Sequence, residues 1–235
     1  MKHSTVLREH IENIVYSESD WQLLEEKRKS AINLLEIFVK EGFNPFVHGS
    51  IARGDVHEMS DIDIIFLQEI PPYQIEIILN KNGYNHYFKE IIMATPSDSI
   101  KLYIHISELE SIAIPLTKFD ASVTEFYTFG GKIDYNHLNS GIRVAGIDKR
   151  LVLIKPTLEG HEEISIISNE GMVAKVVGIS INTVNERKKV LLRREKHGRT
   201  GVFLKRKIQM NETTEEVLKK LANRKSIVRK KLFKR

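Results

Sequence analysis

Two short motifs hold the residues whose types and spacing could do chemistry. Gly49-Ser50 is a turn whose backbone N–H groups and hydroxyl can hold a phosphate. Asp61 and Asp63 follow eleven residues later and flank one apolar residue. Alternate side chains of a strand share a face, so these carboxylates would repel each other unless a cation joins them. Hard divalent metals prefer such oxygen ligands, so the two motifs together indicate chemistry on a nucleoside triphosphate.

The elements around these motifs follow from hydrophobic periodicity. Apolar residues recur at helical spacing over about 20–41, where Ser19 can cap the helix and Gly42 can end it. A short strand is predicted over 46–48, just before the Gly-Ser turn, and the strand 62–67 carries the carboxylates. The order is therefore helix, short strand, turn and carboxylate strand.

The pattern predicts further elements on both sides of this unit. We expect helices over 4–16 and 73–81, and strands over 87–93, 100–107 and 151–154. From about 108 to 165 the pattern is weaker and predicts a connector with some β structure. The last third of the chain is predicted to be mostly helical.

Composition limits the class of protein. The chain has 235 residues, of which 41% are hydrophobic and 29% charged, as in soluble globular proteins of one large or two small domains. No apolar run is long enough to span a membrane, and residues 1–4 lack an apolar signal core. The absence of cysteine excludes disulfides and cysteine-based zinc sites. These features predict a cytoplasmic protein with no membrane partner.

Charge is divided unevenly along the chain. Residues 166–235 contain 20 Lys and Arg against 6 Asp and Glu, a net charge of +14. Residues 1–165 contain 16 against 25, a net charge of −9. The acidic part suits metal binding, whereas the basic part suits a polyanion.

The complete motif is more specific than its parts. Gly-Ser-Ile-Ala-Arg-Gly-Asp at 49–55, followed by Ser-Asp-Ile-Asp-Ile at 60–64, resembles the signature of the DNA polymerase β-like nucleotidyltransferase superfamily, and the small prokaryotic members especially. The resemblance covers roughly residues 30–110. It implies a small mixed sheet with helices on one side, and transfer of a nucleotidyl group with loss of pyrophosphate.

The resemblance also implies a role for each motif residue. Gly49 and Ser50 would hold the triphosphate, and Asp61 and Asp63 would bind one or two Mg²⁺ ions. Arg53 would either contact phosphate or brace the loop through an internal ion pair.

The chain departs from the superfamily pattern at the third catalytic position. The superfamily usually places a third carboxylate on a neighbouring strand, but the candidate strand 101–107 contains no acid. His105 stands where the acid is expected and is our candidate, since histidine can act as a general base or a metal ligand. Glu90 and Glu108 are the nearest acidic alternatives. His48, beside the Gly-Ser turn, is expected to be structural.

The basic third resembles a DNA-binding helix-turn-helix over 171–184, in which Gly178 would supply the tight turn. A β wing is predicted over 196–206, and a basic helix over 214–235. The residues expected to contact nucleic acid are Thr183, Asn185, Lys188, Lys189, Arg199 and Lys205.

The predicted fold is therefore α/β, of the α+β type. A nucleotidyltransferase domain would occupy 1–118, a connector 119–165, and a winged helix-turn-helix with a basic C-terminal helix 166–235. This order also resembles a group of uncharacterised prokaryotic predicted nucleotidyltransferases. A homodimer is possible, because helix-turn-helix proteins often read two half-sites.

Three functions fit these features. The first is a Mg²⁺-dependent nucleotidyltransferase whose basic domain binds nucleic acid, most simply DNA. The second is a DNA-binding transcriptional regulator with an inactive, nucleotide-sensing domain, which the missing third acid favours. The third, a template-independent tRNA end-adding enzyme, would normally need a longer chain.

Overall fold

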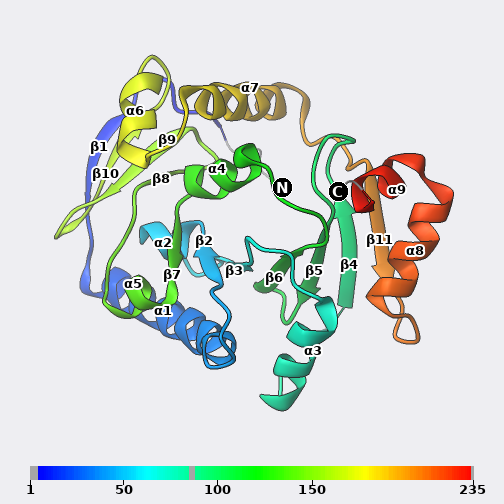
Figure 1. The fold of residues 1–235 in the computed structure, drawn as a ribbon. Helices are drawn as coiled ribbons and strands as arrows, with labels where there is room; N and C mark the ends of the chain where they lie inside the picture. Colours follow the sequence, from blue (N-terminus) through cyan, green and yellow to red (C-terminus); the bar gives the residue numbers. More distant parts are fainter. Residues whose placement is uncertain (1–4, 85–87, 234–235) are drawn as a thin grey trace.

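The computed structural model describes residues 5–84 and 88–233, and Figure 1 labels its helices and strands. The strands are β1 (Ile11–Val15), β2 (Phe46–His48), β3 (Ile62–Ile65), β4 (Phe88–Met93), β5 (Lys101–His105), β6 (Glu110–Pro115), β7 (Lys132–Asp134), β8 (Gly146–Ile147), β9 (Val152–Pro156), β10 (Gly160–Ser165) and β11 (Leu204–Ile208). The helices are α1 (Glu18–Val39), α2 (Ser50–Arg53), α3 (Pro72–Lys81), α4 (Ala121–Phe129), α5 (Tyr135–Asn139), α6 (Glu170–Val177), α7 (Ile181–His197), α8 (Thr214–Arg224) and α9 (Ser226–Leu232).

Two sheets organise these elements. The large sheet has the strand order β11-β4-β5-β6-β3-β2-β7, and the small sheet has the order β1-β10-β9-β8. In the large sheet β3 pairs with β6 in parallel, and the other neighbours are antiparallel. The structure thus confirms a mixed α/β fold.

One face of the large sheet is covered by α1, α3, α8 and α9. Leu35 and Phe38 of α1 are three residues apart, on one face of the helix, and belong to the same core cluster as Ile64 of β3. All three side chains are fully buried. Val217 of α8 belongs to the same cluster. The C-terminal helices therefore complete the core of the sheet that carries the carboxylate motif.

The opposite face of the large sheet holds the chemistry. Alternate side chains of β3 point to opposite faces, so Ile65 leaves the first core and packs with Ala113 and with Tyr127 of α4. Asp63 shares this second face with Ile65. As Figure 1 shows, α4 and α7 lie on this side of the molecule.

The small sheet forms a separate core with the helix pair α6–α7. Leu153 of β9, Val173 of α6 and Val184 of α7 are fully buried and pack with Phe129 of α4. Gly178 ends α6 in the left-handed region, with φ 75°, so that α7 can turn back. The helix pair α6–α7 is thus anchored to the small sheet and to α4.

The N-terminal prediction was wrong. The predicted helix over 4–16 is instead a strand, β1, that pairs with β10 from Ile11 to Val15, and residue 4 lies outside the described residues. Leu7, Ile11 and Ile14 have helical spacing, but pairing with a strand 150 residues away in the sequence overrides it. The following helix is as predicted, although Ser17 rather than Ser19 caps it by accepting from the backbone N–H of Asp20.

The C-terminal prediction needs two corrections. The strand expected as a wing beside the helix pair is β11, which pairs with β4 at the edge of the large sheet, so the described residues form no winged helix. The basic tail is two helices, α8 and α9, with 234–235 outside the described residues. Burying Leu204 and Ile208 against the large sheet explains why β11 lies there.

The region predicted as a connector also contributes to both sheets. β7 extends the large sheet beside β2, whereas β8, β9 and β10 build the small sheet. Among the described residues, no helix has the length and apolar character needed to cross a membrane.

Candidate active site

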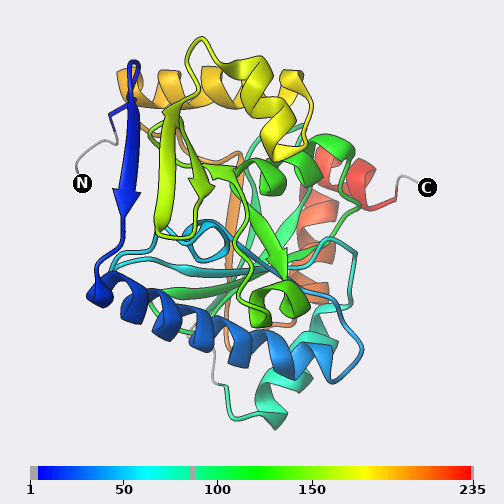
Figure 2. The same cartoon turned by 90° about the vertical axis from the view of Figure 1, so that its left-hand side faces the viewer.

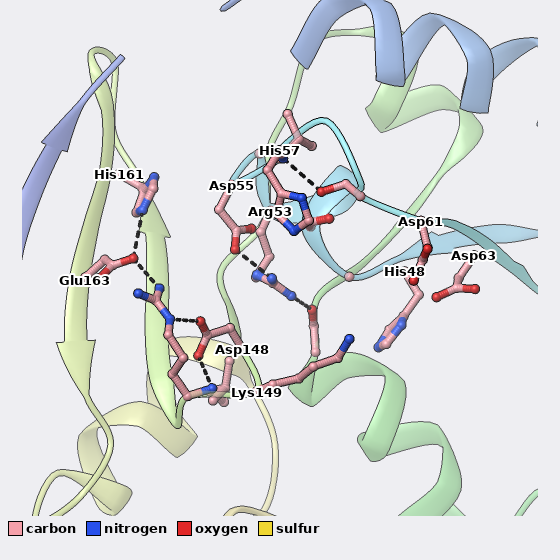
Figure 3. Close-up of a pocket in the computed structure, with 18 of the residues that line it drawn as sticks. His48, Arg53, Asp55, His57, Asp61, Asp63, Asp148, Lys149, His161 and Glu163 are labelled. Carbon is pink, nitrogen blue, oxygen red and sulfur yellow. Dashed lines mark hydrogen bonds and ion pairs between the residues drawn. The ribbon is translucent and has the colours of Figure 1, made fainter. Parts of the chain in front are cut away.

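A cleft of about 720 Å³ lies between the two sheets and α7. The Gly-Ser turn and the start of β3 contribute to one side of it, and the turn between β8 and β9 together with α7 contributes to the other. Figure 3 shows Asp61 and Asp63 at one end, with the small sheet at the other. The structure therefore gathers the predicted motif and parts of the basic third around one cavity.

Gly49 and Ser50 lie on the cleft. Gly49 has φ 85°, a backbone conformation that residues other than glycine seldom adopt, and its N–H donates to the carbonyl of Gly131 at 2.9 Å. This turn starts α2 at Ser50, whose half-buried side chain borders the cavity. The glycine requirement thus has a backbone cause.

Asp61 and Asp63 are brought together at the start of β3. Asp61 is exposed, whereas Asp63 is half-buried and accepts a hydrogen bond from the hydroxyl of Ser111 at 2.7 Å. Burial raises the pKa of Asp63; the Ser111 hydrogen bond opposes this, and the neighbouring charge of Asp61 adds to it. We refer to Asp61 and Asp63 as the acidic wall.

Arg53 braces the loop. Its guanidinium lies 2.8 Å from Asp55, donates to the carbonyl of Gly130, and is 6% exposed. Figure 3 shows its guanidinium bonded to Asp55 and set apart from Asp61 and Asp63. Of the two predicted roles, the geometry favours the internal ion pair.

His48 packs between the acidic wall and α4. It lies opposite Asp63 in the β2–β3 pairing and stacks on Phe126, with ring centroids 5.9 Å apart. Burial and the positive charges nearby, beginning with Arg53, lower the pKa of His48 to about 3, so the ring is neutral. A Cβ atom on Gly130 would collide with this ring, which explains the glycine at the end of α4.

His105 does not lie next to the acidic wall. The strand adjacent to β3 is β6, where Ser111 lies opposite Asp63. His105 lies opposite Ser111 on the next strand, β5, so one strand separates it from Asp63. The His105 ring stacks on Phe88, with centroids 4.3 Å apart, and its Nε2 lies 3.3 Å from Glu90. The position beside Asp63 is therefore held by a serine in this chain.

Three cations on the opposite side were missed by the sequence analysis as site residues. Lys149 comes from the β8–β9 turn, and Arg187 and Arg194 come from α7. Arg187 and Arg194 are seven residues apart, so they lie on the same face of the helix. Lys149, Arg187 and Arg194 are the basic wall. Their signal was present in Asp148-Lys149-Arg150 and in the basic helix, but the sequence does not show that they face the motif.

Two members of the basic wall, Arg187 and Lys149, are positioned by neighbouring residues. The guanidinium of Arg187 lies 4.6 Å from the ring centroid of Phe126, and burial lowers the pKa of Arg187 to about 10. The turn that carries Lys149 is fastened by Asp148, whose carboxylate accepts from the backbone N–H of Arg150 and of Val152. Figure 3 shows Lys149 extending toward the side of the acidic wall.

The two walls are not paired with other charges. Among the described residues, none of the five side chains has an ion-pair partner within 4.0 Å. Desolvation makes an unpaired charge costly for Asp63 and Arg187, which are half-buried, whereas Asp61, Lys149 and Arg194 are exposed to solvent. Such an arrangement suits an anion that meets cations on one side and a metal on the other.

The far end of the cleft is a neutralised network. Glu163 accepts from Arg150 and lies near His161, and the Tyr16 hydroxyl contacts both His161 and the carbonyl of Gly54. Burial opposes the charge of Glu163, but the hydrogen bond from Arg150 holds its pKa below the usual value. His10, Glu12 and Glu163 come close enough together to hold a metal, yet Glu163 is already occupied by these neighbours.

The predicted nucleic-acid residues divide into two groups. Thr183 is buried and bonds to Glu125, Lys188 pairs with Glu170, and Lys205 pairs with Glu90 at 2.9 Å. The remaining three are Asn185, which is half-buried, and Lys189 and Arg199, which are exposed.

Residues 32–129 match a nucleotidyltransferase domain. The match runs from within α1 to the end of α4, and it includes the Gly-Ser turn and the acidic wall. It ends before the basic wall begins. Comparisons with curated proteins and with solved structures found no match. The nucleotidyltransferase-like region therefore supports a transferase, while the other side of the cleft comes from sequence outside it.

Proposed function

We propose that this protein transfers a nucleotidyl group from a nucleoside triphosphate to a hydroxyl acceptor. The observation that supports this most strongly is the pairing of an unpartnered acidic wall with an unpartnered basic wall across one cleft. In the reaction, the acceptor oxygen bonds to the α-phosphorus and the bond to the α–β bridging oxygen breaks. Pyrophosphate leaves, and the acceptor proton passes to water.

The acidic wall fits a magnesium ion. Both carboxylates lack a cation, and Ser111 engages only Oδ1 of Asp63 among the described residues. When bound there, Mg²⁺ would neutralise the triphosphate and lower the pKa of the attacking hydroxyl.

The protein's own groups would bind and orient the phosphates. The hydroxyl and backbone N–H of Ser50 lie on the same cleft as the acidic wall, whereas the Gly49 N–H is bonded to Gly131, and the basic wall supplies three cations. The planar guanidinium of Arg187 is pre-oriented by Phe126 and can bind phosphate oxygens in a bidentate manner. Arg53 would act indirectly by holding the loop, and His105 lies too far along the sheet to be assigned a part in the reaction.

A nucleic-acid partner is the second part of this proposal. The net charge of +14 over residues 166–235 and the exposed Lys189 and Arg199 support binding to a polyanion. Binding to duplex DNA and to single-stranded RNA at 50 and 200 mM salt would test it. We expect affinity to fall with salt, and to fall uniformly in Lys189→Glu/Arg199→Glu. An affinity that changes neither with salt nor in the Lys189→Glu/Arg199→Glu variant would contradict a role for these two residues in nucleic-acid binding.

A specific observation also favours the alternative of a DNA-binding regulator that senses nucleotides without turnover. Ser111 occupies the position beside Asp63, and it supplies no negative charge for a second metal or for a base. The protein would then bind a nucleoside triphosphate in the same cleft but not consume it.

One experiment separates the two functions. The wild type and Asp61→Asn/Asp63→Asn are incubated with each α-³²P-labelled nucleoside triphosphate, Mg²⁺, and total cell nucleic acid and protein as acceptors. Glu69→Gln, an exposed carboxylate beyond the same strand, is the control. Label transferred by the wild type and the control alone supports the transferase. Nucleotide binding without transfer or pyrophosphate release supports the sensor.

A further inference from the structure

The small sheet ends in an edge strand that lacks the usual protection against pairing. β1 has five residues, and Ile11 and Val15 are 83% and 67% exposed. Figure 2 shows β1 along the outer side of this sheet. Sheet edges are normally kept apart by charged side chains, especially lysines, by prolines or by very short strands; β1 has no lysine or proline, and its one charge is the exposed Glu12.

The other three edges in the described part of the chain are protected. β11 carries exposed Lys205 and Lys207, which repel a like strand. β7 has only three residues, and β8 only two. β1 is therefore the exception among the edges of the two sheets.

The backbone groups of β1 are arranged for pairing. In the register with β10, the carbonyl of His10 accepts from Ser165 and the N–H of Tyr16 donates to Glu159. Residues of an antiparallel strand alternate between bonding to one neighbour and facing away from it. The N–H and carbonyl groups of Ile11, Asn13 and Val15 therefore face the open edge.

The sequence of β1 is complementary to itself. In an antiparallel pair with Asn13 opposite Asn13 of a second copy, Ile11 lies opposite Val15 of that copy and Val15 lies opposite its Ile11. Pairs of β-branched residues are favourable across strands. In the same register Glu12 lies opposite Ile14, so no like charges meet. This register also uses all three outward-facing residues.

We propose that β1 is a homodimer interface, in which two copies pair their β1 strands antiparallel about a two-fold axis at Asn13. The two small sheets then form one continuous eight-stranded sheet. The interface is small, so the dimer dissociates at about micromolar concentration. Ile14 of β1 and Tyr16, which follows the strand, line the cleft, so the interface adjoins the site but does not depend on its function.

The test is the oligomeric state of the full chain, measured by sedimentation velocity between about 1 and 100 μM. Ile11→Lys/Val15→Lys places lysines opposite each other in the proposed register and should be monomeric. Leu158→Lys, at a 97% exposed position in the turn after β9, is the matched control and should dimerise like the wild type. A wild type that stays monomeric at the highest concentration overturns the proposal, as does a double-lysine variant that dimerises normally.

A second measurement does not depend on affinity. The chain has no cysteine, so Asn13→Cys introduces a single thiol on the proposed axis. Opposed residues there have Cα atoms about 5.5 Å apart, which a disulfide can span. Mild oxidation should give a covalent dimer of Asn13→Cys but not of Leu158→Cys. Equal cross-linking of both variants would contradict the register.

Discussion

The two walls of the cleft have different origins in the chain. The acidic wall comes from Asp61, just before β3, and Asp63 within it, in the segment that matches a nucleotidyltransferase domain. The basic wall comes from a turn of the small sheet and from α7, and it lies outside that segment. The comparison teaches that a short motif can place a pair of carboxylates, while the cations across the cleft are brought there by packing of distant elements.

The largest expected effect is on the acidic wall. Asp61→Asn/Asp63→Asn should lower nucleotidyl transfer by about 1,000-fold, because losing a bound metal ion removes several kcal/mol of transition-state stabilisation. Steady-state release of pyrophosphate measures it. The circular dichroism melt should not fall, because the change removes repulsion between neighbouring carboxylates. Transfer at the wild-type rate would show that the acidic wall holds no essential metal.

The second effect separates Arg53 from the basic wall. Arg53→Met should cost about 3 kcal/mol of unfolding free energy, or about 6–12 °C in melting temperature, because it leaves Asp55 without its partner in a poorly exposed site. Thermal melts of the purified variant measure this. A normal melting temperature with a raised KM for the nucleotide would instead make Arg53 a phosphate ligand.

The third effect is on the basic wall itself. Arg187→Gln should raise the KM for the nucleotide about 10- to 100-fold, because charge-assisted hydrogen bonds to phosphate contribute about 1.5–3 kcal/mol. Lys189→Gln, an exposed change on the same helix, is the control and should leave KM unchanged. If both variants bind nucleotide equally well, α7 does not contribute to the nucleotide site.

The smallest effect concerns Ser111. Its hydrogen bond opposes the rise in the pKa of Asp63, so Ser111→Ala raises that pKa further. Metal binding needs the carboxylate and is lost as pH falls through its pKa, so the loss should occur at higher pH in the variant. We expect roughly two- to tenfold weaker Mn²⁺ binding on the acid side, and no change near neutral pH. Electron paramagnetic resonance titrations at several pH values measure this. If Mn²⁺ affinity on the acid side of the pH profile is the same in both proteins, Ser111 does not affect metal binding by Asp63.

The nucleotidyltransferase-like motif was readable because its geometry is local. Alternation along one strand is enough to put Asp61 and Asp63 on the same side, and a glycine with positive φ is enough for the turn. The same local reasoning predicted α1 correctly. It was wrong for β1, where helical spacing was overridden by pairing with β10.

Other features depended on which strands become neighbours. The sequence analysis searched 101–107 for the third catalytic residue, but β6 is the strand that follows β3 in the sheet. The wing was wrong for the same reason, since β11 adds to the large sheet rather than to the helix pair. Strand order is a long-range property that residue spacing does not report.

The sequence by itself determined the residue types, the turn, the carboxylate pair and the charge division of this protein. These depend on backbone preferences and periodicities that act over a few residues. Only the tertiary structure decided that Arg187 and Lys149 face the carboxylates, that Ser111 lies beside Asp63, and that β1 is an open edge. Those outcomes follow from burial of distant apolar surfaces against each other, which fixes neighbours that no local pattern contains.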